Sequence, residues 1–281
     1  MPKEQNPSCM IVSYMLEFLE YGFMQRAFIS GILIAMVCSI IGLYLVLRRM
    51  ALIGDGLAHI SFGGIAAGMF FGIYPLISAL IFSILSVIGI QKLKKMKVYG
   101  DAAIAIMFSF GLSLGVILLS YSGGFNADLF SYLFGSILSV SQNDLYLISI
   151  LAIGVLSFVF LFYKELFYIT FDEEGAKVSG INVERFNTAL LILCAIAIVI
   201  SLRVVGVLLV ASFIAIPAST ALLFRSSFKN SIIFSAVIAI SSIIIGLSAS
   251  YYLDLAAGGA VVFTLVLVFA LSLIYKNLLK K

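Results

Sequence analysis

Residues 23–47 read FMQRAFISGILIAMVCSIIGLYLVL and are apolar along nearly their whole length. About 20 apolar residues in a helix are enough to cross the roughly 30 Å hydrocarbon core of a bilayer. Similar runs recur along the 281-residue chain, in which 63% of residues are hydrophobic, 11% are charged and the mean hydropathy is +1.22. Because soluble domains lie far from this composition, the sequence predicts an all-α, polytopic integral membrane protein.

The apolar runs predict eight to nine transmembrane helices. The second and third runs, and likewise the sixth and seventh, are joined by almost no loop. Eight spans, or a half-membrane hairpin in place of two spans, therefore fit the same pattern. We expect helices near 23–47, 52–73, 74–91, 101–120, 144–163, 187–202, 204–224, 231–250 and 259–275.

Every second loop carries lysine or arginine residues, which is typical of loops on the cytoplasmic side of a membrane. The carboxyl terminus is therefore predicted to be inside, and nine spans place the amino terminus outside. Arg203 is the exception, between two spans on the outer side. The lysines from 92 to 97 either fix this orientation, which is the commoner role, or bind anionic membrane lipid. The basic residues of the predicted cytoplasmic loops are Arg48, Arg49, Lys92, Lys94, Lys95, Lys97, Lys164, Lys177, Arg185, Arg225, Lys229, Lys276, Lys280 and Lys281.

The net charge of +4 is accounted for by these loops, and no basic stripe with interleaved aromatic residues stands outside the membrane. Nucleic acid is therefore not expected as a partner. Residues 1–22 are predicted to form an interfacial segment, because Glu17 and Glu20 interrupt the short apolar run that a cleaved signal peptide would need. No linker divides the chain, which is expected to be a single transmembrane domain over 1–281.

The only histidine, His59, follows Asp55 by four residues in the sequence GDGLAH at 54–59. Residues four apart on an α-helix share one face, so the carboxylate and the imidazole can meet there. Ionisable side chains in membrane segments cost about 2.5–3.5 kcal/mol by insertion scales and usually mark an ion path. The pair predicts half of a metal site, and simple hydrogen bonding of the two side chains is the alternative.

The largest soluble piece is the segment around 164–186, on the predicted cytoplasmic side. Acidic residues open a short helix there, where the helix dipole favours them, and a glycine is placed to end it. The segment is either a simple connector or a surface on which a separate motor protein docks. The residues concerned are Phe171, Asp172, Glu173, Glu174, Gly175, Ala176, Gly180 and Ile181.

Four further features are explained by packing, capping or loop roles, although the helix at Pro217 also suits a translocation pathway and residues 130–138 also suit its outer mouth. Pro217 lies deep in an apolar run before small residues, which predicts a kinked, closely packed helix. Residues 130–138 are apolar but short, and predict an interfacial or re-entrant helix on the outer side. Asp101 is predicted to cap the following span, and Asp254 to lie in an outer loop.

Two motifs of enzymes are missing from the chain. It has no Gly-x-x-x-x-Gly-Lys-Ser/Thr loop for ATP, and its single histidine cannot form a His-Glu-x-x-His zinc site. An enzyme is therefore not expected, nor is a permanently bound cofactor.

Six motifs together resemble the membrane subunits of the manganese/zinc/iron family of ABC importers. They occur in family order and span most of the chain. The family often has a proline and a glycine soon after the position of Asp254, where this chain has AAGG at 256–259, and usually has a proline at the position of Glu173. The motifs are Gly54–His59, Gly100–Ile106, Tyr132–Leu138, Phe171–Glu174 with Gly180 and Ile181, Val205–Val210 with Pro217 and Ala218, and Ser250–Asp254.

The resemblance implies a type II ABC importer-like permease in the cytoplasmic membrane of a prokaryote. It implies a homodimer that works with cytoplasmic ATPase subunits, which hydrolyse the ATP, and with an extracytoplasmic metal-binding protein. The cargo is then a divalent cation, Zn²⁺, Mn²⁺ or Fe²⁺, and its transit site is formed by Asp55 and His59 from both protomers. The residues from Phe171 to Ile181 match the segment that couples to the ATPase.

Two other transport functions share some of these features. A secondary transporter could carry protons on Asp55 or His59, although the inverted repeats and paired broken helices usual in such folds are not found. A permease for a larger metal complex is the second alternative, although that related class tends to have longer chains without an intramembrane Asp-x-x-x-His.

Overall fold

The helices of the fold follow the apolar runs closely. The computed structural model describes residues 21–121, 127–136, 140–224 and 226–278, so the predicted interfacial segment over 1–22 lies almost wholly outside the described residues. The described elements are α2 (Gly22–Leu47), α3 (Leu52–Phe71), α4 (Pro75–Lys95), α5 (Gly100–Tyr121), α6 (Ala127–Phe134), α7 (Gln142–Leu161), α8 (Tyr163–Phe171), α9 (Glu173–Val178), α10 (Val183–Ser201), α11 (Val210–Leu223), α12 (Phe228–Leu253) and α13 (Ala257–Leu278).

Eight of the described helices are long and apolar enough to cross a membrane, which confirms the predicted eight to nine spans. The run predicted over 204–224 forms the shorter helix α11, whose 14 residues extend about 21 Å. It begins six residues later than the run because the chain leaves the helical conformation between α10 and α11. Pro217 lies inside α11, as predicted.

The turn between α10 and α11 is paired with the last turn of α6 and with the backbone just after it. The N–H group of Val207 donates a hydrogen bond of 2.9 Å to the carbonyl of Tyr132. Gly206 has a φ of +86°, and a Cβ atom there would collide with the backbone of Gly135. Backbone groups away from water must be paired inside the protein, and here the end of α6 provides the partners. This helix overlaps the short outer helix predicted at 130–138, of which residues 137 and 138 lie outside the described residues.

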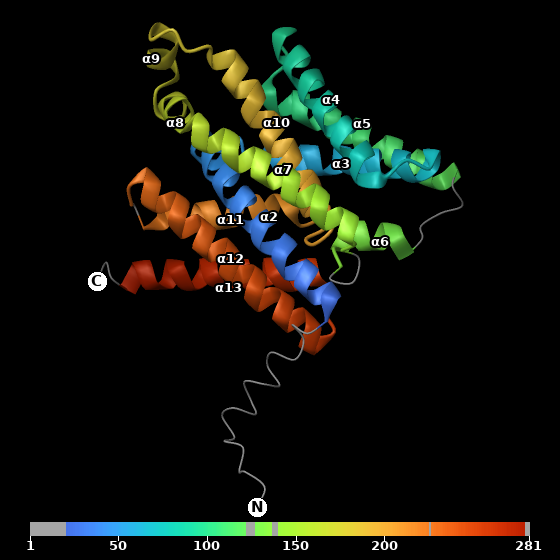
Figure 1. The fold of residues 1–281 in the computed structure, drawn as a ribbon. Coiled ribbons are helices and arrows are strands. Elements are labelled where there is room, and N and C mark those ends of the chain that lie inside the picture. The colour runs from blue at the N-terminus through green and yellow to red at the C-terminus, as the bar shows by residue number, and fades with distance from the viewer. Residues whose placement is uncertain (1–20, 122–126, 137–139, 225, 279–281) are drawn as a thin grey trace, which may run out of the picture.

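The loops sort onto two sides of the bundle. In Figure 1, α8 and α9 lie at one end, and the beginning of α2 and the turn between α12 and α13 lie at the other. The end with α8 and α9 also carries the basic loops, as the cytoplasmic side of a membrane protein does. It is called the inner side below, and the opposite end is called the outer side.

The central helix is α3, which has the largest buried share of the eight long helices described. It crosses α5 at Gly63 and Gly111, where a Cβ atom on either glycine would collide with the backbone of the other helix. This close approach places α5 directly against the face of α3 that carries Asp55 and His59.

Replacing Gly111 with alanine is expected to push α3 and α5 apart and to lower the free energy of unfolding by about 1–3 kcal/mol. Thermal unfolding of the purified chain in detergent measures the change. Gly154→Ala is the matched control, because a Cβ atom at that position in α7 meets nothing within 4 Å. Equal midpoints for the two variants would contradict the close helix crossing.

Candidate functional site

Asp55 and His59 lie on one face of α3, as their spacing predicts. Asp55 is in the first turn of the helix, and its Oδ1 atom is 3.8 Å from Nε2 of His59. That separation is too long for a direct hydrogen bond. It is shorter than the roughly 4.2 Å that two zinc–ligand bonds can span, so one divalent cation can contact both atoms.

The two side chains differ in exposure. The side chain of His59 is 16% exposed, and its ring lies against Phe108 of α5 with 4.3 Å between the ring centroids. The side chain of Asp55 is 52% exposed and opens onto a pocket of about 380 Å³ between α3 and α5. The imidazole is therefore held in place by α5, whereas the carboxylate faces the open space. The pocket is lined by Leu52, Asp55, Gly56, Asp101, Ile104, Ala105, Phe108 and Ser109.

Asp101 is a further carboxylate on the wall of this pocket. The sequence predicted it to cap the span, but α5 begins at Gly100, so Asp101 lies inside the first turn instead. Its place near Asp55 depends on the crossing of α3 and α5 and has no local signal in the sequence. Its carboxylate adds a second negative charge to the wall of the pocket that Asp55 lines, which favours the entry of a cation.

Among the described residues, one chain has too few metal-ligating side chains here for a complete metal site. Within the residues that the structure describes, no three His, Cys, Asp or Glu side chains come together as a group that could hold a metal ion. A protein zinc site usually has three or four protein ligands. A cation held here would therefore need further ligands from water or from another molecule that faces the pocket.

The short cytoplasmic helix forms where the sequence predicted it, in α9. Asp172 caps its beginning, since the side chain accepts a 2.8 Å hydrogen bond from the N–H group of Gly175. Gly180 has a φ of +83°, and the N–H group of Ile181 donates to the carbonyl of Ala176 at 3.0 Å. These contacts form a Schellman motif, which ends the helix.

The α9 helix presents apolar side chains to solvent. Val178 is 90% exposed, and Phe171 just before the helix is also exposed. Ala176, on the opposite face, is buried against Ile169 and Val183. An apolar surface on a helix anchored in this way is typical of a contact site for another protein.

Arg48 connects α9 to two membrane helices. Arg48 is the residue that directly follows α2. Its guanidinium donates hydrogen bonds to Oδ1 of Asn187 in α10 at 2.5 Å and to Oε2 of Glu173 at 3.0 Å. The hydrogen bond from Lys177, with the charge of Arg48, lowers the pKa of Glu173. Glu173 is therefore ionised at neutral pH, and its ion pairs are lost only as acidification passes below the ordinary carboxyl pKa of about 4.3.

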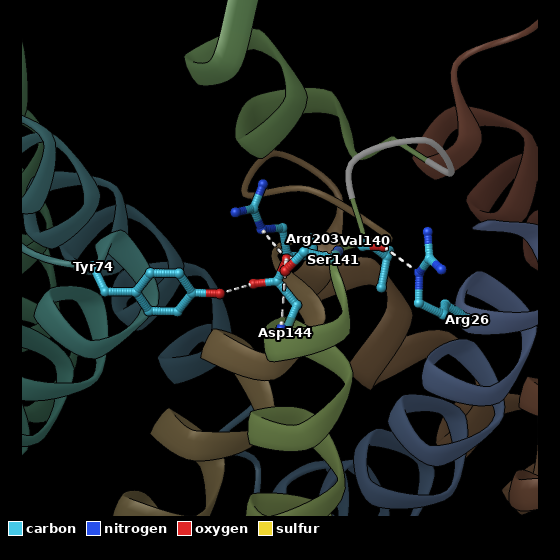
Figure 2. Close-up of polar contacts among 6 residues, drawn as sticks. All are labelled: Arg26, Tyr74, Val140, Ser141, Asp144 and Arg203. Atoms are coloured by element: carbon cyan, nitrogen blue, oxygen red, sulfur yellow. Dashed lines mark hydrogen bonds and ion pairs between the residues drawn. The ribbon is translucent and has the colours of Figure 1, made fainter. Parts of the chain in front are cut away.

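A buried ion pair joins three elements on the outer side (Figure 2). Asp144 in α7 is fully buried, and its Oδ2 atom is 3.3 Å from Nε of Arg203. The carboxylate also accepts hydrogen bonds from the N–H group of Ser141, at 2.9 Å, and from the hydroxyl of Tyr74 before α4. The guanidinium carbon of Arg203 lies 4.1 Å from the ring centroid of Tyr132. The ends of α4 and α7 and the turn after α10 are thus held together.

Reasoning from the sequence missed this outer cluster. It placed Asp144 at the start of a span and Arg203 as an exception among the basic residues. A lone arginine on the outer side was the available signal, since a charge between two spans requires a partner.

Burial, together with the hydrogen bond to Asp144, raises the pKa of Tyr74, so its hydroxyl remains a donor.

Comparisons with known proteins agree over nearly the whole chain. The sequence matches the ABC 3 transport family over residues 20–276. A "Probable metal transport system membrane protein" of Treponema pallidum is 36% identical over 258 residues, which are 91% of this chain and 97% of that protein. The manganese transport system membrane protein MntC of Listeria innocua is 34% identical over 258 residues, 92% of each chain.

A solved structure has the same architecture. The structure titled PsaBC from Streptococcus pneumoniae in complex with Fab contains a chain that is 31% identical and superposes with a TM-score of 0.85. The alignment covers 93% of this chain and 95% of that chain.

Replacing Asp144 with asparagine is expected to destabilise the protein by about 3–5 kcal/mol, because it leaves the Arg203 guanidinium without its counter-ion in a buried place. Thermal unfolding in detergent measures the loss. Asp254→Asn is the control, because Asp254 is exposed and its φ of +51° suits asparagine. If both variants unfolded at the same temperature, the outer ion pair would not stabilise the fold.

Proposed function

The chain belongs to the ABC 3 transport family and is a multi-pass membrane permease subunit of an ABC metal importer; from this premise we propose that Asp55 and His59 form the transit site of its cation. The family predicted from the sequence is thereby confirmed, and the chain is a transport subunit rather than an enzyme. The family match covers residues 20–276, which supports treating 1–281 as one permease domain.

The observation that carries the proposed site is the separation of 3.8 Å between a carboxylate oxygen and an imidazole nitrogen on one helix face. Both atoms are hard or intermediate donors of the kind that divalent transition metals accept. Neither side chain has a hydrogen bond among the described residues that would account for it as a packing group. Asp55 also lines a pocket, where a cation and its water can enter.

A second copy of the chain supplies the missing ligands in the proposed assembly. The helix beside the pocket, α5, has a small buried share within one chain, and its exposed side chains include Ile106, Phe110 and Ile117. An apolar face next to an incomplete polar site is consistent with a two-fold interface. In such a dimer, two Asp55 carboxylates and two His59 imidazoles surround one cation.

Manganese is the proposed cargo. Relatives named as manganese transport proteins, among them MntC and the manganese import system permease protein ScaB of Streptococcus gordonii, are 34% and 33% identical to the chain. Carboxylate and water ligands suit Mn²⁺, whereas imidazole ligands also accept Zn²⁺ and Fe²⁺. Competition between the three ions in an uptake assay distinguishes them.

Replacing Asp55 or His59 with alanine is expected to abolish metal uptake, because each change removes a ligand from both halves of the site. Uptake of radioactive Mn²⁺ by cells or proteoliposomes containing the complete transporter measures the effect. Asp55→Asn retains one ligand oxygen without the charge and is expected to leave only residual uptake. Size-exclusion chromatography serves as the control that the complex still assembles, and undiminished uptake by an assembled variant would refute the ligand role.

We further propose that α9 docks on a separate ATPase subunit, where ATP is bound and hydrolysed, and that an extracytoplasmic metal-binding protein delivers the cation at the outer side. The exposed Val178 and Phe171 support the first contact. Arg48 connects α9 to the membrane helices, because it binds Glu173 of α9 and lies only four residues before the beginning of α3. Through this contact, a displacement of α9 would move the beginning of α3, the helix that carries Asp55.

Replacing Arg48 or Glu173 with glutamine is expected to lower the amount of Mn²⁺ imported per ATP hydrolysed, while the assembled complex still hydrolyses ATP. The double variant should lose no more than either single variant, because both changes break the same contact. Lys177→Gln is the matched control, since Lys177 also pairs with Glu173 but is exposed. Additive losses in the double variant would show that the two residues act separately.

A further inference from the structure

A second hollow lies on other helices of the chain. It is a groove of about 890 Å³ between α7 and α12, with Ile40 of α2 at its base and α8 at its inner end. Its walls are apolar and include Phe160, which is 84% exposed, and Ile233. Because α7 and α12 are membrane-spanning helices, the groove opens sideways toward lipid.

Charged residues line only the inner end of this groove. Tyr163 at the beginning of α8 packs against Phe228 at the beginning of α12, with 5.9 Å between the ring centroids. The residues that follow them, Lys164 and Lys229, both line the groove, and Glu165 lies beside them. The contact between the two rings therefore brings two lysines from distant parts of the sequence to one rim.

Both lysines lack a protein counter-ion among the described residues. Their side chains are exposed, and no described carboxylate lies within 4.0 Å of either ammonium group, whereas Lys95 and Lys177 each pair with a glutamate. With Glu165, the rim carries one net positive charge. A phosphodiester carries one negative charge, so a single anionic headgroup neutralises the rim.

We propose that this groove binds one anionic phospholipid, with the phosphodiester between Lys164 and Lys229 and an acyl chain along the walls formed by α7 and α12. Basic pockets between membrane helices on the cytoplasmic side hold anionic headgroups in this way. The aromatic residues at the rim are typical of the membrane interface. A phosphatidylcholine headgroup has no net charge and leaves the rim positive, so phosphatidylglycerol is favoured over it.

Native mass spectrometry of the full chain in detergent, titrated with phosphatidylglycerol or phosphatidylcholine, tests the proposal. The wild-type chain is expected to retain one phosphatidylglycerol molecule selectively. Each lysine near an anionic group contributes about fivefold in binding, so Lys164→Gln with Lys229→Gln should bind about thirtyfold more weakly. Arg185→Gln with Lys276→Gln removes the same charge from residues on the inner side that do not line the groove, and should leave binding unchanged.

A second variant tests the acyl-chain part of the groove. Ile233→Trp fills the apolar wall without changing any charge and should also weaken retention of phosphatidylglycerol. Excess inorganic phosphate should not displace the lipid, because it makes no contact with that wall. The proposal is overturned if the wild-type chain retains both lipids equally, if the two double variants with charge removed behave alike, or if inorganic phosphate displaces the lipid.

Discussion

A backbone polar group in hydrocarbon has no water to bind, and this constraint decides where the chain can leave a helix. Between α10 and α11 it leaves one, and there the N–H group of Val207 is paired with the carbonyl of Tyr132. Glycines at 135, 206 and 258 let the three backbones approach, since a side chain at any of them would meet a neighbouring carbonyl or amide. The end of α6, the turn that delays the start of α11 and the start of α13 meet at this one junction.

The two sides of the bundle are held by contacts of different strength. On the outer side, the ion pair of Asp144 and Arg203 is buried, and separating one partner from the other would leave an unpaired charge away from water. On the inner side, Glu173 is 41% exposed, so water can solvate its carboxylate when it leaves Arg48, whose side chain is only 9% exposed but also donates a hydrogen bond to Asn187. In the proposed coupling, movement therefore begins more easily at the inner side, while the outer elements move together.

Features with a local cause could be predicted from the sequence, and features that depend on packing could not. Hydropathy placed the long helices, and capping residues placed α9 between Asp172 and Gly180, although the proline usual at position 173 is a glutamate. The four-residue spacing placed Asp55 beside His59. The partners of Arg48 and Arg203 come from distant segments, as do the residues of α3 that share a pocket with Asp101, and only the crossing of helices brings them together. The length of α11 depended on a backbone pairing that hydropathy does not register.

The charge of the proposed site follows from its division between two copies. Among the proposed direct ligands of one chain, Asp55 supplies a single negative charge, which leaves a divalent cation only half neutralised by its ligands. Two copies supply two charges and neutralise Mn²⁺ or Zn²⁺, but a monovalent cation would leave an excess negative charge. Separation of the two copies by even a small distance halves the neutralisation and removes two of the four protein ligands. A site divided in this way can bind a divalent cation firmly in one arrangement of the dimer and release it in another.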